Sequence, residues 1–236
     1  MAHTHAEPAA RRQRFTIYLC LALLLAFPLF SDAVEHSVGR LAQSSGEIGA
    51  RVLTESAIWL FAGLILAIAL VWEPRTIKSI GLRRPKISTL PLGLGAAVAL
   101  VVLGGAASFV TYNVLHAPNH TPAQAERLIR GSFVYAMFLA VRGGVVEEIL
   151  YRGLAIEQLA ALTGRRLLAA LIATSVFVAV HLVHFDLRQL IPIATVSFGL
   201  AGIYLWKHNL WINIIAHGLI DALALGAVAA HATSLY

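Results

Sequence analysis

The stretch TESAIWLFAGLILAIALVW, residues 54–72, is apolar at almost every position. An α-helix needs about 20 mainly apolar residues to cross the roughly 30 Å hydrocarbon core of a lipid bilayer. This run has that length, and its only charged residue, Glu55, lies next to its start. The run therefore predicts a transmembrane helix.

The composition of the whole chain agrees with this prediction. Of the 236 residues, 58% are hydrophobic and only 13% are charged, whereas typical globular domains have about 25% charged residues. Such an apolar content excludes a disordered chain, a coiled coil and a basic nucleic-acid-binding domain. The single cysteine, Cys20, excludes an intrachain disulfide and a CxxC metal site. The fold class predicted is an all-α, polytopic bundle of transmembrane helices.

Six further apolar runs resemble residues 54–72, so the bundle is expected to have about seven spans. The predicted spans are residues 15–30, 54–72, 90–115, 132–162, 167–185, 187–206 and 210–230. A polar stretch from His116 to Pro122 separates the third span from the fourth.

The basic residues predict the orientation of the bundle. Eleven Lys and Arg residues fall in the segments on the N-terminal side of the membrane and five in those on the other side. Because cytoplasmic loops carry the excess of positive charge, we expect a cytoplasmic N-terminus in the cell (inner) membrane. The alternative is that Arg11 to Ala33 forms a secretory signal with its cleavage site, which leaves the remaining topology unchanged.

Ionisable residues interrupt three of the predicted spans. The fourth span contains Glu147-Glu148-Ile149-Leu150-Tyr151-Arg152-Gly153, the fifth contains His181 followed by His184, and the seventh contains His217 and Asp221. Ionisable side chains are costly within a bilayer and usually mark a functional site there. His184 is interpreted as an interhelical hydrogen-bonding residue.

Helical spacing assigns different roles to the two adjacent glutamates. Residues four apart share a helix face, so Glu148 is expected to pair with Arg152, and His217 to meet Asp221. Glu147 lies about 100° around an α-helix from Glu148 and has no cation nearby in sequence. Glu147 is therefore the carboxylate predicted to transfer protons.

The same residues are predicted to lie at one depth. At 1.5 Å per residue, Glu147, His181 and Asp221 lie about 21–27 Å from the inner turns, and His217 about 15 Å. Three helices thus bring carboxylates and imidazoles to one layer of the bilayer. A carboxylate and an imidazole that hold one water are sufficient for hydrolysis, with neighbouring donors stabilising the oxyanion.

Three ordered motifs carry a resemblance to a known family. They are Glu147-Glu148-x-x-x-Arg152, Phe177-x-x-x-His181 and His217-x-x-x-Asp221. In this order, they resemble the motifs of the CAAX protease and bacteriocin-processing family of intramembrane proteases, related to the type II CAAX prenyl endopeptidase. The resemblance covers roughly residues 132–224 and implies an intramembrane endopeptidase.

The resemblance implies roles for the first two motifs. Glu147 and His181 would activate the water, and Glu148 and Arg152 would support the structure of the site. Together with the predicted spans, it divides the chain into a cytoplasmic tail (1–14), N-terminal helices and connectors (15–131), catalytic core helices (132–231) and a C-terminal tail (232–236).

The third motif departs from the pattern of the prenyl endopeptidases. His217 and Asp221 would form the oxyanion site, but the prenyl endopeptidases usually have Asn at the second position. An Asp donates a hydrogen bond only when protonated, so Asp221 is an alternative candidate for orienting His217.

The resemblance leaves the cofactor and the partners partly open. No cofactor is predicted; if the reaction depends on a metal, the expected ligands of a zinc ion are Glu147, His181 and His217. The expected partners are the lipid bilayer and a membrane protein or peptide substrate, with or without a lipid group, and no nucleic acid. The alternative function is a non-catalytic membrane protein, either a proton-linked transporter or an immunity or scaffold protein that retains the family core.

Overall fold

The computed structural model describes residues 6–45, 47–72, 75–119, 123, 125–126, 129, 132–183 and 185–233. Helices account for nearly all of these residues, and the described part of the chain contains no β-strand. The all-α prediction is therefore confirmed. The chain divides into two compact units, Met1–Ile77 and Lys78–Tyr236, and each is described by itself.

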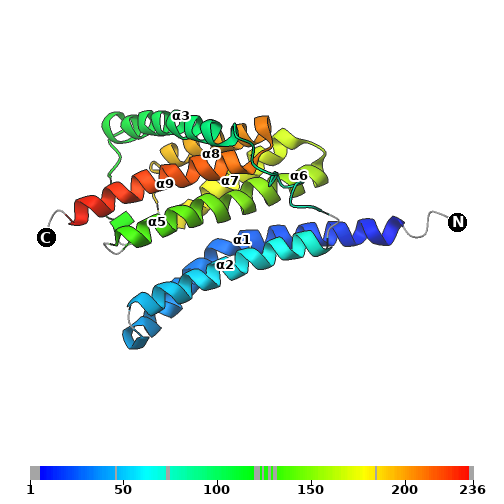
Figure 1. Cartoon of the computed structure of the whole chain (residues 1–236), viewed down its shortest axis with the longest axis horizontal. Coiled ribbons are helices and arrows are strands. Elements are labelled where there is room, and N and C mark those ends of the chain that lie inside the picture. Colours follow the sequence, from blue (N-terminus) through cyan, green and yellow to red (C-terminus); the bar gives the residue numbers. More distant parts are fainter. Residues whose placement is uncertain are drawn as a thin grey trace. The chain divides into compact units, whose positions relative to one another are not determined.

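The first unit is a hairpin of two long helices, α1 (Ala6–Ser45) and α2 (Glu47–Trp72), which lie side by side in Figure 1. Phe27 and Phe30 both stack on Phe61, with ring centroids 6.0 and 4.2 Å apart. The thiol of Cys20 lies 3.9 Å from the carbonyl oxygen of Ile65. Helix α1 extends beyond the predicted span 15–30 at both ends, because polar residues continue the helix where the apolar run stops.

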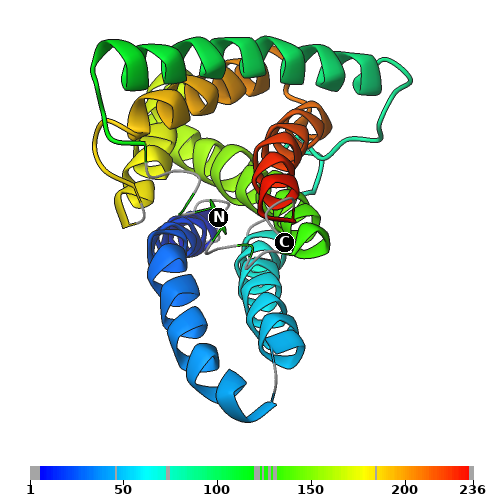
Figure 2. The ribbon, with the colours of Figure 1, turned by 90° about the vertical axis from the view of Figure 1, so that its left-hand side faces the viewer.

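The second unit contains the other helices whose bounds the described residues define. They are α3 (Thr89–Phe109), η1 (Val110–Val114), α5 (Phe133–Arg142), η2 (Gly143–Ala155), α6 (Ile156–Thr163), α7 (Arg166–Val180), η3 (His181–Val183), α8 (Leu190–Lys207) and α9 (Leu210–Thr233). Helix α3 packs against α8 and α9, and Figure 2 shows it lying across α8. Leu100 and Leu200 are buried where these helices meet. Helices α5 and η2 pack against the other side of the bundle, along α9.

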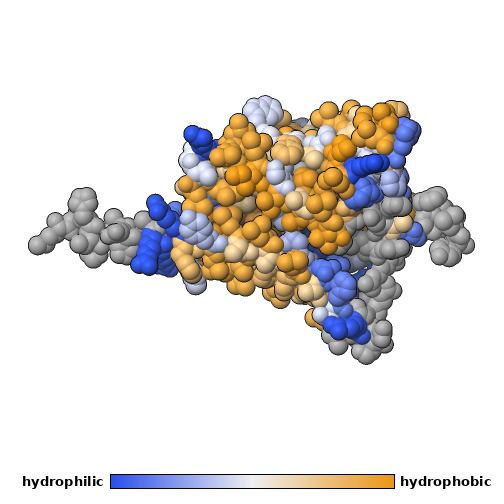
Figure 3. Space-filling model, turned by 180° about the vertical axis from the view of Figure 1, so that it is seen from behind, coloured by the Kyte–Doolittle hydropathy of each residue, from blue (hydrophilic) through white to orange (hydrophobic). Residues whose placement is uncertain are grey.

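Six helices of the described chain are long and apolar enough to cross a membrane. They correspond to six of the seven predicted spans. The other predicted span, the fourth, is also helical from Phe133 to Thr163, but it carries the charged residues that the sequence placed there. Hydrophobic side chains cover most of the face in Figure 3, and hydrophilic ones gather near its edges. The protein is therefore an integral membrane protein.

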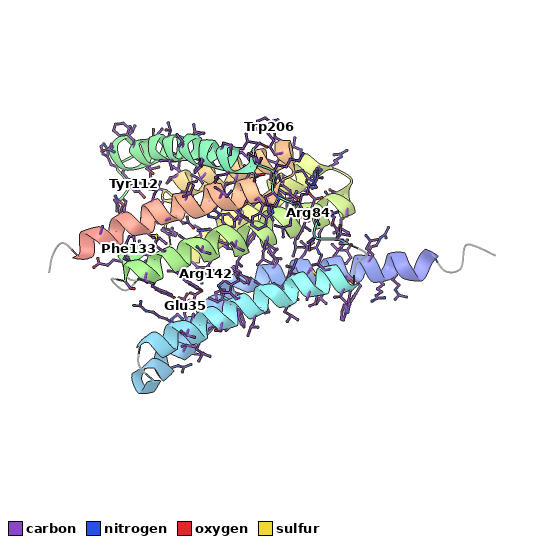
Figure 4. All side chains as sticks on the ribbon, viewed as in Figure 1. Glu35, Arg84, Tyr112, Phe133, Arg142 and Trp206 are labelled. Carbon is purple, nitrogen blue, oxygen red and sulfur yellow. The ribbon has the colours of Figure 1, made fainter. Side chains whose placement is uncertain are left out.

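Aromatic and basic residues mark the two ends of the second unit. Figure 4 shows Arg84 and Trp206 at one end and Tyr112 and Phe133 at the other. Tyrosine and tryptophan are enriched where a membrane protein passes through the lipid headgroups. The two ends thus correspond to the two membrane surfaces.

The connector before α3 is fixed to the turn between α8 and α9. The carbonyl oxygen of Gly81 accepts a hydrogen bond of 3.0 Å from the N–H of Leu210, and the indole N–H of Trp211 donates to the carbonyl oxygen of Arg83 at 2.8 Å. Gly81 has a φ of +84°, and a Cβ there would lie 2.8 Å from the ring of Tyr204. Only glycine fits this position without strain.

A polar cluster joins the same connector to three helices. The carboxylate oxygen Oε1 of Glu157 accepts hydrogen bonds from Arg166, from the Tyr204 hydroxyl at 3.0 Å and from Nε2 of His208 at 3.2 Å. The other ring nitrogen of His208, Nδ1, accepts from Arg83 at 2.9 Å. Because a guanidinium only donates, His208 must be neutral while this contact exists.

This cluster predicts a pH-dependent stability. Burial is the main cause that lowers the pKa of His208 below its ordinary value. The unfolded chain then binds more protons than the folded chain as the pH falls below about 6.5, so acidification destabilises the fold. We expect the thermal midpoint in detergent micelles to fall between pH 7 and pH 5, and to fall less in His208→Gln. The exposed His36→Gln serves as the control, and an unchanged pH slope in His208→Gln would contradict the assignment.

Candidate active site

The π-helix η2 carries a buried ion pair. Glu148 and Arg152 are 0% and 1% exposed, and Oε1 of Glu148 lies 2.8 Å from Nη1 of Arg152. Nη2 of Arg152 also donates to the carbonyl oxygen of Ser197 on α8 at 3.2 Å. The pairing of Glu148 with Arg152 is as the sequence spacing predicts, because opposite charges inside a membrane protein must compensate each other.

An aromatic side chain from α7 completes the surroundings of Arg152. The guanidinium carbon lies 4.5 Å from the ring centroid of Phe177, which is a cation–π contact. The ring of Tyr151 meets Phe177 edge-on at 4.8 Å. Phe177 therefore links the first and second motifs directly.

The imidazole of His217 on α9 lies among three carboxylates. Nδ1 is 2.8 Å from Oε1 of Glu148, so the buried glutamate holds one side of the ring. Nε2, on the other side, is 3.5 Å from Oδ2 of Asp221 and 3.9 Å from Oε2 of Glu147. The two adjacent glutamates thus face opposite ring nitrogens of one histidine, and the role of Glu148 extends beyond the predicted pair with Arg152.

His181 reaches the cluster through Phe177. Its Nδ1 lies 2.7 Å from the carbonyl oxygen of Phe177, and the two rings are 4.8 Å apart. Helix α7 ends at Val180, and the backbone N–H of His181 donates to the carbonyl oxygens of Val178 and Ala179. The carbonyl oxygen of Phe177, which this N–H would contact in a continuing α-helix, is contacted by the imidazole instead. A carbonyl oxygen only accepts, so Nδ1 carries the hydrogen and Nε2 of the neutral ring is the acceptor. The Phe177 ring is also 6.5 Å from that of His217.

Two glycines allow η2 to approach α9 closely. A Cβ at Gly143 would lie 2.5 Å from Oδ2 of Asp221, and a Cβ at Gly144 would lie 2.8 Å from Cα of Gly218. Small residues permit such close contact between membrane helices. The contact brings Glu147, which follows these glycines, to Asp221 and His217.

The comparisons with known proteins agree with this geometry. Residues 129–223 match the family model described as type II CAAX prenyl endopeptidase Rce1-like. This part of the chain is similar to that family. No curated protein and no solved structure matches the chain.

The matched segment contains all six residues that the sequence singled out for the site. Glu147, Glu148, Arg152, His181, His217 and Asp221 lie between residues 129 and 223. The resemblance to the CAAX protease family is therefore confirmed. His184 lies outside the described residues.

Two of the three predicted zinc ligands, Glu147 and His217, approach each other to 3.9 Å, and the ring of the third, His181, packs against Phe177. Among the described residues, no three His, Cys, Asp or Glu side chains form a group that could hold a metal ion. The zinc alternative stays a prediction.

One polar residue of the matched segment was not predicted from the sequence. Asn213 on α9 is fully buried and contacts Glu148. It precedes His217 by four residues, so the helical spacing that related His217 to Asp221 places Asn213 on the same face. That spacing was the available signal.

Proposed function

We propose that the protein is an intramembrane endopeptidase that hydrolyses a peptide bond near the membrane surface. The observation that carries the proposal is the approach of Glu147 to Nε2 of His217, at 3.9 Å, inside a membrane domain of a protease family. Catalytic contacts are often longer without a substrate than in the working complex. This approach of a carboxylate and an imidazole from different helices supports the proposal.

In the proposed reaction, Glu147 is the general base. It takes a proton from a water molecule, and the water oxygen bonds to the carbonyl carbon of the scissile peptide. The carbon–nitrogen bond then breaks, and Glu147 returns the proton to the leaving amine. His181 accepts a hydrogen bond from the same water through Nε2, because its Nδ1–H is engaged with the carbonyl oxygen of Phe177.

His217 is proposed to stabilise the oxyanion. With Nδ1 bound to Glu148, the ring presents Nε2 toward Glu147 and Asp221. When Nε2 carries a proton, it donates to the negative oxygen of the tetrahedral intermediate. The carboxylate of Asp221 beside Nε2 stabilises that proton, so we assign Asp221 to the support of His217.

The substrate is proposed to be a membrane-associated peptide with a lipid group near its C-terminus. The support is the name of the matched family, which is that of prenyl endopeptidases acting on CAAX sequences. We further propose a location in the cell (inner) membrane with a cytoplasmic N-terminus, which is supported by the distribution of basic residues.

The proposal is tested with the full chain reconstituted in phospholipid vesicles. A peptide ending in a CAAX sequence is supplied with and without a farnesyl group, and the released C-terminal peptide is measured by mass spectrometry. We expect faster cleavage of the farnesylated peptide, and a rate about 100-fold lower in His181→Ala because a group that orients the water is lost. Leu182→Ala, an exposed neighbour, is the control and is expected to retain activity. Equal rates for the wild type and His181→Ala would contradict the proposal.

A further inference from the structure

Asn213 is a fully buried amide in the apolar middle of the second unit. Its Nδ2 donates two hydrogen bonds, one to Oε2 of Glu148 at 3.1 Å and one to the carbonyl oxygen of Leu200 at 2.8 Å. Its Oδ1 has no hydrogen-bond partner among the described residues. The side chain therefore acts through its two N–H donors.

The two acceptors fix the orientation of this amide. If the amide were flipped, Oδ1 would face a carboxylate oxygen and a carbonyl oxygen, and neither can donate when Glu148 is ionised. The orientation with Nδ2 toward Glu148 and Leu200 satisfies both acceptors. The amide is therefore held between η2 and α8 in one conformation.

Asn213 contacts the carboxylate oxygen that the other partners leave free. Arg152 and His217 both approach Oε1 of Glu148, each at 2.8 Å, while Asn213 approaches Oε2. An ion pair and one hydrogen bond at the same oxygen leave the carboxylate free to rotate about that oxygen. The hydrogen bond from Asn213 to the other oxygen fixes the carboxylate plane, and with it the direction in which Oε1 meets Nδ1 of His217.

We propose that Asn213 is a positioning residue that fixes Glu148 and thereby the ring orientation of His217, with Nδ1–H held by Glu148 and Nε2–H of the imidazolium directed at the oxyanion. This inference rests on the proposed function, in which Nε2 of His217 faces the reacting carbonyl. A partner that holds one ring nitrogen of a functional histidine fixes the orientation of the ring, and thereby the direction of the other nitrogen. Asn213 acts on His217 indirectly, because it hydrogen-bonds to the carboxylate of Glu148, which in turn hydrogen-bonds to His217.

A purely structural role for Asn213 makes a different prediction. Buried amides also serve as interhelical hydrogen bonds in membrane proteins. In that case, replacing Asn213 lowers the stability of the bundle but leaves the kcat and the pH profile of the folded molecules unchanged. The charged group that contacts the amide is Glu148 on η2, and Glu148 in turn contacts Arg152 on η2 and His217 on α9.

The test compares Asn213→Ala and Asn213→Asp with the wild type in vesicles, using the cleavage of a farnesylated CAAX peptide. Loss of a hydrogen bond to a charged group is expected to lower kcat about 10- to 100-fold in Asn213→Ala, with little change in KM. The pH profile should also shift, because the environment of His217 changes. The Asn213→Asp variant has nearly the same shape as the wild type. When the new carboxyl group is protonated, it can still donate to Glu148, and when it is ionised it cannot. The activity of this variant should therefore recover at low pH and fall as the pH rises.

The control is Thr174→Val on α7, which is buried and similar in shape but removes a hydroxyl that has no hydrogen-bond partner among the described residues. It is expected to keep the wild-type kcat and pH profile.

If Asn213→Ala does not fold, the pH dependence of Asn213→Asp decides the question. If the folded Asn213 variants keep the wild-type kcat and pH profile while Glu147→Gln is inactive, the role of Asn213 is wrong and the proposed function stands. If Glu147→Gln is also fully active, the proposed function itself is wrong.

Discussion

Replacing Glu147 with Gln is expected to lower kcat by about 100- to 10,000-fold, the range typical of a lost general base. Glutamine has nearly the same shape but cannot take the proton of the attacking water or return it to the leaving amine. Because the change preserves the size of the side chain, η2 and its contact with α9 should be retained. The measurement is the initial rate of peptide release by the reconstituted variant at saturating substrate.

The matched control for this substitution is Glu126→Gln, which neutralises an exposed glutamate in the same unit. We expect this variant to cleave at the wild-type rate. Both variants must be shown to be folded and inserted before their rates are compared. A Glu147→Gln variant that retains more than a tenth of the wild-type kcat would show that Glu147 is not the base.

Replacing Arg152 with Met is expected to destabilise the protein by about 3–5 kcal/mol, because it leaves Glu148 as a buried, uncompensated charge. Arg152 is 1% exposed and also contacts Ser197 and Phe177, so its removal affects η2, α7 and α8 together. The measurement is the free energy of unfolding in mixed detergent micelles. Arg165→Met, which removes an exposed arginine, serves as the control and should change stability by less than about 0.5 kcal/mol.

The double variant Glu148→Leu/Arg152→Met separates stability from activity. Replacing a whole buried ion pair by apolar residues of similar volume is often neutral or stabilising, so most of the lost stability should return. Activity should not return, because His217 loses the acceptor at Nδ1. If the free energy of unfolding of the single variant Arg152→Met lies within about 1 kcal/mol of the wild-type value, the role assigned to this pair is wrong.

The helices could be predicted from the sequence because their signal is local. Apolar runs of membrane-spanning length mark the helices, and the predicted and observed ends of the third, sixth and seventh spans differ by only a few residues. The pair of Glu148 with Arg152 could be predicted for the same reason, since both residues belong to one turn.

The π-helix and the contacts of His217 could not be predicted in this way. The helix η2 adopts its wider form where Gly143 and Gly144 press against α9, which is a contact between segments far apart in sequence. Spacing within α9 indicated that Asp221 accompanies His217, but the hydrogen bond from Nδ1 to Glu148 spans 69 positions in the chain. Asn213 was not predicted because it is an uncharged amide, and the site was predicted from ionisable residues within the apolar helices.

The most direct test of the central claim measures peptide cleavage and proton flux in the same vesicles, since clustered carboxylates and histidines in a membrane also build proton relays. Vesicles that contain the protein and an entrapped pH-sensitive dye receive the farnesylated CAAX peptide, and both signals are followed over time. A hydrolytic centre predicts release of the C-terminal peptide without proton flux, and loss of that release in Glu147→Gln. Proton flux that depends on Glu147, with no cleavage of any peptide offered, would contradict the account.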